Sequence, residues 1–358
     1  MEDIKNKQDL LIEEVKDKRN SLTTDKLDMS YGEIISMYEN EDIIINPEFQ
    51  RLFRWNDEKK TRFIESILLG IPIPPIFVAE DSDGRWELVD GLQRVSTVMS
   101  FFGLLRGEEN KEKNYWKLQE GELITNFEGM GIDDLPLLFK RNIKRAYCRV
   151  EILKWDSKVD MRYELFNRLN TGGESLTEQE IRNCIFRDVS DEFNKYLDRI
   201  AFNPKFKELM CVSKQKESEA YLQELVLRVS SLYDDWNNIK TKNISKYITQ
   251  FMESSVKDGF NYDIEKIFER AIDVILPLGS SVFRFENNQL STSLVDAIFV
   301  MTMRNIDYYE NQDSSVLLEK INLLKSDSEF RRYVGSNSSS KSRVAKRLDR
   351  AFEIFKAE

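Results

Sequence analysis

The segment at residues 86–102 constrains the fold of this chain most, because its hydrophobic period changes within a few positions. Residues 86–89 form a short apolar run that is typical of a strand. From Leu92 onward the apolar residues recur at spacings of three and four, which is typical of a helix. Asp90 and Gly91 separate the two patterns and have the composition of a turn. The sequence therefore predicts a strand that passes almost directly into a helix.

The predicted turn carries four residues suited to binding a phosphate group. The first turn of a helix presents unpaired N–H groups and the positive end of the helix dipole. Gly91 lets the backbone approach a ligand closely, Arg94 offers a planar fork of donors, and Gln93 offers an amide. Asp90 could hold a Mg²⁺ ion, or it could cap the helix through its carboxylate. Residue types alone leave both roles of Asp90 open.

The chain contains no histidine, and this excludes whole classes of chemistry. Histidine metal sites, Ser–His and Cys–His nucleophile pairs and histidine-dependent nucleases all require that residue. Catalysis would have to come from carboxylates, Arg, Lys, amides, hydroxyls, backbone dipoles or a bound Mg²⁺. The net charge of −10 argues against a protein that coats nucleic acid without sequence preference, although a local basic groove is compatible with it.

The remaining composition predicts a cytoplasmic protein of about two domains. A chain of 358 residues exceeds the usual size of one domain. No apolar run approaches the roughly 20 residues that span a bilayer, and the charged start of the chain does not resemble a signal peptide. The three cysteines, Cys148, Cys184 and Cys211, lie far apart and form no C-x-x-C pair. We therefore expect reduced thiols with a packing role.

The order of these patterns divides the chain into three parts. Residues 1–28 are charged, with a weak apolar stripe, and predict a helical leader. Residues 29–190 mix strand and helix patterns and include a charge-rich stretch at 108–130 that we expect to be a loop or insertion. Strands are expected at 43–45, 76–79, 86–89 and 146–153. Strand patterns almost disappear after residue 190, so residues 191–358 predict an all-helical domain and the whole chain an α+β fold.

A second candidate segment, FQRLFRW at residues 49–55, combines aromatic residues with two arginines. Arg51 and Arg54 could neutralise phosphates while the rings stack on a base, or they could be an exposed pair above a small aromatic cluster. Gln50 could bond to a phosphate, a ribose or water, or satisfy a backbone group. Glu48 is a second acidic candidate for Mg²⁺, with a solvated surface position as its alternative.

A third segment, NRLNTGG at residues 167–173, ends a predicted helix. Thr171 and Gly172 could bring backbone N–H groups to a ligand in a nest-like turn. Helix termination is the alternative, because Asn and Gly are common helix stops. Three further polar side chains could close over a nucleotide or contact its base: Asn167, Arg168 and Asn170.

Two features of the C-terminal half concern helices. Thr177 is followed three residues later by Glu180, which is the spacing of a capping box. The last predicted helix, from residue 341 onward, is basic and includes Arg347 and Arg350. It could contact DNA phosphates, although the acidic net charge favours a solvated helix face.

Taken in order, three boxes and a proline connector resemble the N-terminal domain of GmrSD-type restriction endonucleases. The boxes are FQRLFRW at 49–55, DGLQR at 90–94 and FNRLNTGG at 166–173, and the connector is IPIPP at 71–75. The resemblance spans about residues 30–190. It implies a ParB/sulfiredoxin-like fold with a D-G-Q-Q-R box, in which a nucleotide is bound and hydrolysed for defence against foreign or modified DNA.

The chain departs from the pattern of that family at two points. Leu92 replaces the first Gln of the box, which removes one polar group from the expected site. The HNH nuclease domain that often accompanies the family depends on histidine, which this chain lacks. We therefore expect any DNA cutting to come from a separate nuclease or effector chain.

The resulting expectation is an NTP-binding and NTP-hydrolysing component of a prokaryotic restriction or anti-phage system, with Mg²⁺ and an NTP of unidentified base as cofactors. Asp90, Gln93 and Arg94 are the expected catalytic residues, and Asp90 and Glu48 the expected metal ligands. The alternative is a non-catalytic sensor of nucleotide or DNA that regulates a separate nuclease. DNA and a second copy of the chain are further candidate partners, and no binding to a membrane is expected. The other expected nucleotide-binding residues are Gln50, Arg51, Arg54, Gly91, Asn167, Arg168, Asn170, Thr171 and Gly172.

Overall fold

The chain forms two compact units, Met1–Gly173 and Glu174–Glu358. The computed structural model describes residues 2–21, 23–45, 53–81, 83–154, 157, 163–166, 168, 177–186, 191–335 and 338–356. Among these residues, no helix is both long enough and apolar enough to cross a membrane.

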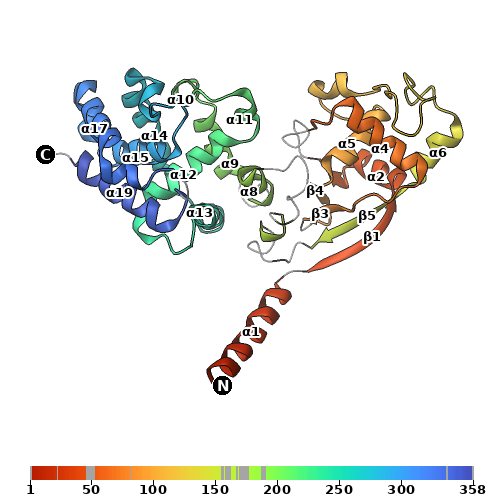
Figure 1. Ribbon diagram of the computed structural model, residues 1–358, viewed down its shortest axis with the longest axis horizontal. Coiled ribbons are helices and arrows are strands. Elements are labelled where there is room, and N and C mark those ends of the chain that lie inside the picture. Colours follow the sequence, from red (N-terminus) through yellow and green to blue (C-terminus); the bar gives the residue numbers. More distant parts are fainter. Residues whose placement is uncertain are drawn as a thin grey trace. The chain divides into compact units, whose positions relative to one another are not determined.

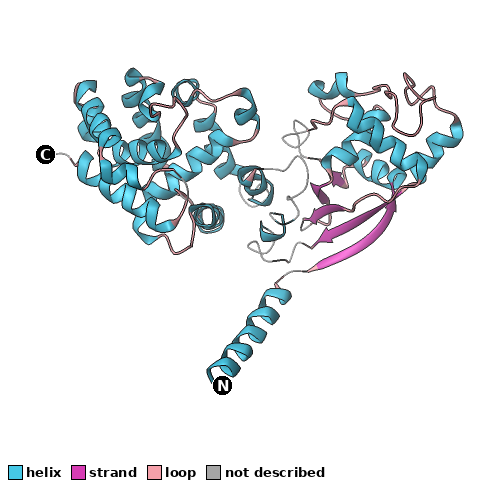
Figure 2. Ribbon diagram, viewed as in Figure 1, coloured by secondary structure: helices cyan, strands magenta, loops and turns pink. Residues whose placement is uncertain are grey.

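The first unit is built on a five-stranded mixed sheet with the strand order β1-β5-β3-β4-β2 (Figure 2). The β1–β5 and β3–β4 pairs are antiparallel, whereas the β3–β5 and β2–β4 pairs are parallel. The strands are β1 (Thr24–Ser30), β2 (Ile43–Ile44), β3 (Ile76–Glu80), β4 (Trp86–Asp90) and β5 (Tyr147–Leu153). The helices are α1 (Glu2–Asn20), α2 (Tyr31–Glu39), α4 (Asp57–Leu69), α5 (Leu92–Phe101), the 3₁₀ helix η1 (Glu108–Lys113) and α6 (Leu137–Arg145).

Helices α2, α4, α5 and α6 lie against one face of the sheet (Figure 1). The strand residues that point toward them are apolar, and Ile76, Val78 and Val150 are 0% exposed. Successive side chains of a strand point to opposite faces, so Phe77 and Glu151 point the other way. We call the side that carries Phe77 and Glu151 the open face. The core of this unit therefore lies between the sheet and the four helices.

The structure confirms the expected α+β class and all four expected strands, but it corrects the boundary of the leader. Residues 1–28 were expected to be helical; α1 ends at Asn20, and residues 24–28 belong to strand β1. Only Met29 of this strand is fully buried, because β1 is an edge strand whose residues are mostly exposed. A strand with so few buried residues has no apolar alternation by which the sequence could predict it. Its conformation comes from pairing with β5.

Helix α4 shows how local sequence sets element ends in this unit. The Asn56 side chain accepts a hydrogen bond from the backbone N–H of Lys59 at 3.0 Å and caps the start of the helix. Gly70 ends it in a left-handed conformation with φ of 70°. Phe63, Ile64 and other apolar residues of one side are buried. The expected helix over residues 57–69 is confirmed with its C-terminal glycine.

In the part of the second unit that the structure describes, the regular elements are all helices, and two isolated β-bridges occur between loop residues. Helix α15 lies at its centre, and every side chain from Ser293 to Met303 is buried. The expected capping box is present: Thr177 and Glu180 exchange hydrogen bonds between side chain and backbone at 2.7 and 3.3 Å. The elements are α8 (Glu178–Phe186), α9 (Asp191–Ala201), α10 (Pro204–Met210), α11 (Lys214–Ser218), α12 (Tyr221–Asp235), η2 (Trp236–Asn238), α13 (Ile244–Asp258), α14 (Asp263–Ile275), η3 (Leu276–Leu278), η4 (Ser280–Phe283), α15 (Thr292–Arg304), α16 (Ile306–Tyr309), α17 (Ser314–Ser326), α18 (Ser328–Arg332) and α19 (Lys341–Phe355).

The basic helix α19 is partly a core helix. Arg347 is 1% exposed and donates to the carbonyl oxygens of Tyr333 and Ser338 at 2.9 and 2.7 Å. Burial lowers the pKa of Arg347 to about 10, an effect that the nearby carboxylate of Asp296 opposes. Arg350 pairs with Asp327 at 2.8 Å. Neither arginine therefore lies on a simple solvated face.

Candidate functional site

The turn between β4 and α5 has the geometry that the sequence predicts. Strand β4 ends at Asp90, and α5 begins at Leu92. Gly91 joins them in a left-handed conformation with φ of 94°. A Cβ atom at this position would lie 2.5 Å from Cγ2 of Ile76, which is closer than two non-bonded carbon atoms can approach. Position 91 therefore requires glycine for its backbone angle and also for the space in front of β3.

The N-cap residue of α5 is Gly91, which forms no side-chain capping hydrogen bond. Asp90, which could have been the cap, instead accepts a hydrogen bond on Oδ2 from Nη2 of Arg94 at 2.7 Å. By contrast, side chains cap the starts of α2 and α4. The N-cap residue of α5 thus supplies no side-chain acceptor to the first turn, which lies at the positive end of the helix dipole.

Arg94 is held between the turn and the proline connector. Its side chain is 13% exposed, and Nη1 donates to the carbonyl oxygens of Pro74 and Pro75 at 2.5 and 2.9 Å. Together with the Asp90 bond, these contacts fix the orientation of the guanidinium plane. The carbonyl-rich connector and the carboxylate of Asp90 are thereby joined through a single residue.

A pair of buried titratable groups lies close to Arg94. Burial raises the pKa of the Tyr31 hydroxyl and of the Cys148 thiol, and the positive charge of Arg94 opposes both shifts. Tyr31 is 0% and Cys148 1% exposed. A buried thiol with a raised pKa is unreactive. The expected packing role of Cys148 agrees with this environment.

Gln93 joins the box to the second candidate segment. Its Oε1 atom accepts hydrogen bonds from the backbone N–H groups of Arg54 and Trp55 at 3.0 and 3.2 Å. Two aromatic residues of that segment pack inward: Phe53 is 7% exposed, and the ring of Trp55 meets that of Phe63 edge-on with centroids 5.7 Å apart. Arg54 is exposed beside the box. Two of the three boxes therefore meet at Gln93.

The third segment reaches the sheet from its open face. Leu165 and Phe166 line a cavity of about 110 Å³ together with Phe77 and Val89. Phe77 is the register partner of Asp90 in the adjacent strand. The start of the third box thus lies against the strand that carries the first residue of the central box. Arg168, the one polar candidate of this segment that the structure describes, is exposed and pairs with Glu164 at 2.8 Å.

Several expected site residues lie outside the residues that the structure describes. They are Glu48, Gln50, Arg51, Asn167, Asn170, Thr171 and Gly172.

The sequence did not single out Glu151, whose carboxylate lines the cavity on the open face. The alternation of residues 147–153 could have assigned it to the face opposite Val150 and Ile152. Which strand would lie beside it depends on sheet order, and strand order does not follow from the sequence of β5.

Asp90 is the candidate metal ligand within the described chain. Its side chain is 39% exposed, and Oδ1 forms no hydrogen bond with the residues described. No three Asp, Glu, Cys or His residues of the described ranges gather to hold a metal ion. Mg²⁺ bound with a nucleotide commonly takes only one or two carboxylates, with water and phosphate oxygens completing its shell. Asp90 can supply one such carboxylate.

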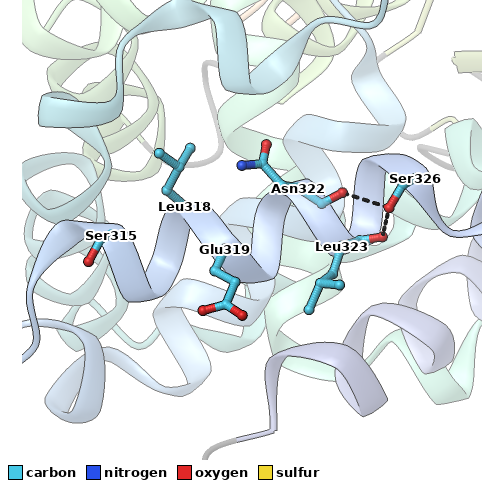
Figure 3. A pocket seen from close by; sticks show the side chains of 6 residues that line it. All are labelled: Ser315, Leu318, Glu319, Asn322, Leu323 and Ser326. Carbon is cyan, nitrogen blue, oxygen red and sulfur yellow. Dashed lines mark hydrogen bonds between the residues drawn. The ribbon is translucent and has the colours of Figure 1, made fainter.

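The second unit has a surface hollow that is lined by none of the box residues. It measures about 350 Å³ and is lined by one side of α17, including Leu318, Glu319 and Asn322 (Figure 3). The Oγ of Ser326 donates to the carbonyl oxygens of Asn322 and Leu323, both at 3.0 Å, so it satisfies its own helix. The residues of this hollow do not form a catalytic grouping.

Comparison with protein families identifies the first unit. Residues 31–187 match the model of the GmrSD restriction endonuclease N-terminal domain. This part of the chain belongs to the GmrSD N-terminal domain family. The match covers all three boxes, the connector and every strand of the sheet except β1.

The match connects this part of the chain to restriction endonucleases, and so to a restriction and defence system. Searches among curated proteins and among solved structures returned no match. The family and the geometry of the turn are thus the two independent grounds for assigning a function.

Proposed function

We propose that the GmrSD N-terminal domain of this chain binds a nucleoside triphosphate at the β4–α5 turn and hydrolyses it, as part of a restriction or anti-phage system. The observation that carries the proposal is the start of α5, whose N-cap residue is a glycine in the left-handed conformation, beside the half-exposed carboxylate of Asp90. Helix starts of this kind are suited to phosphate groups. The box residues Gly91 and Gln93 lie at the same turn.

Phosphoryl transfer requires mainly positioning and the neutralisation of charge. The backbone N–H groups at the start of α5 would bind phosphate oxygens, and Gly91 leaves the backbone open to them. Arg54 adds positive charge beside the turn, because Gln93 holds its backbone there. Asp90 would accept a proton from the attacking water or hold Mg²⁺, while Arg94 keeps its carboxylate oriented. A bound Mg²⁺ would neutralise phosphate charge.

Phosphate release from ATP, GTP, CTP and UTP with Mg²⁺ tests this function, with and without DNA. Asp90→Asn keeps an acceptor for Arg94 but removes the charge, so we expect release to fall at least tenfold. Asp83→Asn is the matched control, because Asp83 is an exposed acidic residue in the nearby β3–β4 turn. Equal release by the wild type and Asp90→Asn would contradict the assignment of Asp90.

Binding without turnover is the second candidate function, and the contacts of Arg94 favour it. Three hydrogen bonds hold its guanidinium to the protein, so less of it is available for a developing phosphate charge. The domain would then sense a nucleotide and signal to a nuclease partner. Nucleotide binding by calorimetry, together with no phosphate release under any condition, would select this alternative. Absence of both binding and release would overturn both functions.

A further inference from the structure

The cavity on the open face lies beside the proposed phosphate site and differs from it in character. Its walls are largely apolar, formed by Phe77 and Val89 of the sheet and by Leu165 and Phe166 of the third segment. At about 110 Å³ it is much smaller than the sites that enclose whole small molecules, which measure roughly 300–1,000 Å³. It has room for one flat ring system rather than for a complete nucleotide.

We propose that this cavity binds the guanine base of the nucleotide, with Glu151 as the residue that selects guanine. This inference rests on the proposed nucleotide function and adds the identity of the base. Aromatic and aliphatic walls suit the face of any base, because every base has an apolar π-surface. Selection must therefore come from the polar groups at the edge of the cavity.

Glu151 and Thr24 are the polar residues that line the cavity, and Lys26 of the neighbouring strand lies beside Glu151. The Glu151 side chain is 18% exposed, and its Oε2 lies 3.4 Å from Nζ of Lys26. Oε1 of Glu151 forms no hydrogen bond with the described residues. Lys26 is 68% exposed, so this ion pair is solvated and contributes little by itself. A ligand can therefore bind both groups at small cost.

Guanine is the base whose pairing edge matches this arrangement. It presents the O6 acceptor next to the N1–H and N2–H donors, so a carboxylate can accept two hydrogen bonds while a lysine donates to O6. Adenine and cytosine each place a ring-nitrogen acceptor beside their amino group, and that nitrogen would face the carboxylate. Uracil offers a single N–H between two carbonyl groups. Only guanine supplies adjacent donors for Glu151.

The register of the sheet sets the distance from this edge to the phosphate site. Lys26, Glu151 and Phe77 are successive register partners across β1, β5 and β3, so their side chains lie on the open face. Phe77 pairs with Asp90 of β4 across a register shift, and Val89, which lines the cavity, directly precedes Asp90. Glu151 and Asp90 are two strands apart, which corresponds to about 10 Å. A nucleotide with its base against Glu151 would extend across β3 and past Val89, and would bring its phosphates to the β4–α5 turn.

Calorimetric binding of GTP, ATP, CTP, UTP and ITP to the full chain with Mg²⁺ tests the inference. Charged hydrogen bonds predict that GTP binds about tenfold or more tightly than ATP. ITP lacks the N2 amino group and should bind with intermediate affinity. Glu151→Gln keeps the shape of the side chain but replaces one acceptor by a donor, so we expect it to abolish the preference for GTP while ATP affinity stays within about twofold.

Asp28→Asn is the matched control variant. Asp28 pairs with Arg149 at 2.9 Å, two residues along the same strands and on the same face, but it does not line the cavity. We expect this variant to keep the full preference for GTP. Thermal unfolding of each variant verifies that the fold is retained.

The outcomes separate this inference from the function on which it rests. Equal affinity for all five triphosphates, or a GTP preference that persists in Glu151→Gln, would overturn the guanine assignment and leave nucleotide binding intact. Failure of every triphosphate to bind would overturn both. A last outcome is that a guanine-containing single-stranded oligonucleotide binds, that this binding is lost in Glu151→Gln, and that GTP does not bind. It would show that the cavity binds a base of DNA, and it would overturn the assignment to a free nucleotide.

Discussion

Arg94 donates to the carboxylate of Asp90 at 2.7 Å while its other terminal nitrogen bonds to two carbonyl oxygens of the proline connector. Asp90 ends β4 and Arg94 lies in the first turn of α5, yet their bond does not merely pair two surface charges. Through its three hydrogen bonds, Arg94 joins the end of β4 to the residues that precede β3. Arg94 therefore has a structural role in addition to any role toward phosphate, and the geometry of Asp90 depends on it.

Arg94→Lys should separate the charge of this residue from its planar fork. A lysine keeps the positive charge but cannot bond to Asp90, Pro74 and Pro75 in the same geometry. We expect the free energy of unfolding to fall by about 1–3 kcal/mol, because the largely buried side chain at position 94 loses its hydrogen bonds to the two connector carbonyl groups and to Asp90. Denaturant unfolding measures this change. Arg85→Lys is the control, since Arg85 is 52% exposed in its pairs with Asp81 and Asp83; an equal loss there would contradict the role of Arg94.

Gly91→Ala should destabilise the domain more than the backbone angle alone can explain. Its Cβ would lie 2.5 Å from Ile76 and the residue has φ of 94°. Gly84→Ala is a matched control, because φ is 83° there and no atom lies within 4 Å of the added Cβ. We expect a loss of about 1 kcal/mol at position 84 and about 2–4 kcal/mol at position 91, measured by denaturant unfolding. Equal losses would mean that Ile76 moves aside without cost.

The sequence predicted the central element well because its signals are local. The change of period at Asp90, the glycine after it and the buried stripe of α5 all lie within a dozen residues, and the structure has the same element in the same place. The N-cap and C-terminal glycine of α4 are local in the same sense. Patterns of this kind depend on neighbouring residues and hardly at all on tertiary context.

The remaining parts of the site depend on contacts between distant segments. The bond from Gln93 to the backbone of Arg54 joins residues 39 apart, and its presence cannot be inferred from either segment. Glu151 becomes a candidate only because β5 lies beside β3 in the sheet. Strand β1 was missed because its stability comes from pairing rather than from its own pattern. Arg347 was expected in a basic helix, and only the packing of α19 reveals that it is buried.

Asp296 is expected to be essential for the stability of the second unit. It is 1% exposed and accepts two hydrogen bonds from Arg228 at 2.6 and 2.8 Å, with Arg347 at 3.7 Å. Asp296→Asn removes the nearest counter-charge of two buried guanidinium groups, so we expect a loss of about 3–5 kcal/mol in the free energy of unfolding. Glu310→Gln removes one partner of an exposed pair with Arg270 and should cost about 1 kcal/mol or less. Similar losses in both variants would contradict the importance of burial.

The stability of the second unit should also depend on pH through Asp327. Hydrogen bonds from Arg350 lower the pKa of this carboxyl below its ordinary value, and the backbone N–H of Phe330 adds to the effect. A lowered pKa in the folded state stabilises the fold above the unfolded pKa of about 3.9, and this stabilisation is lost as the pH falls through the folded pKa. Asp327→Asn can still cap α18 but carries no charge, so we expect it to be less stable than the wild type by about 0.5–1 kcal/mol at pH 7. Denaturant unfolding between pH 3 and 7 should show that this difference disappears toward the acid end, whereas Asp263→Asn, at an exposed carboxyl, should not differ systematically from the wild type. A difference for Asp327→Asn that stays constant with pH would show that its charge does not contribute to stability.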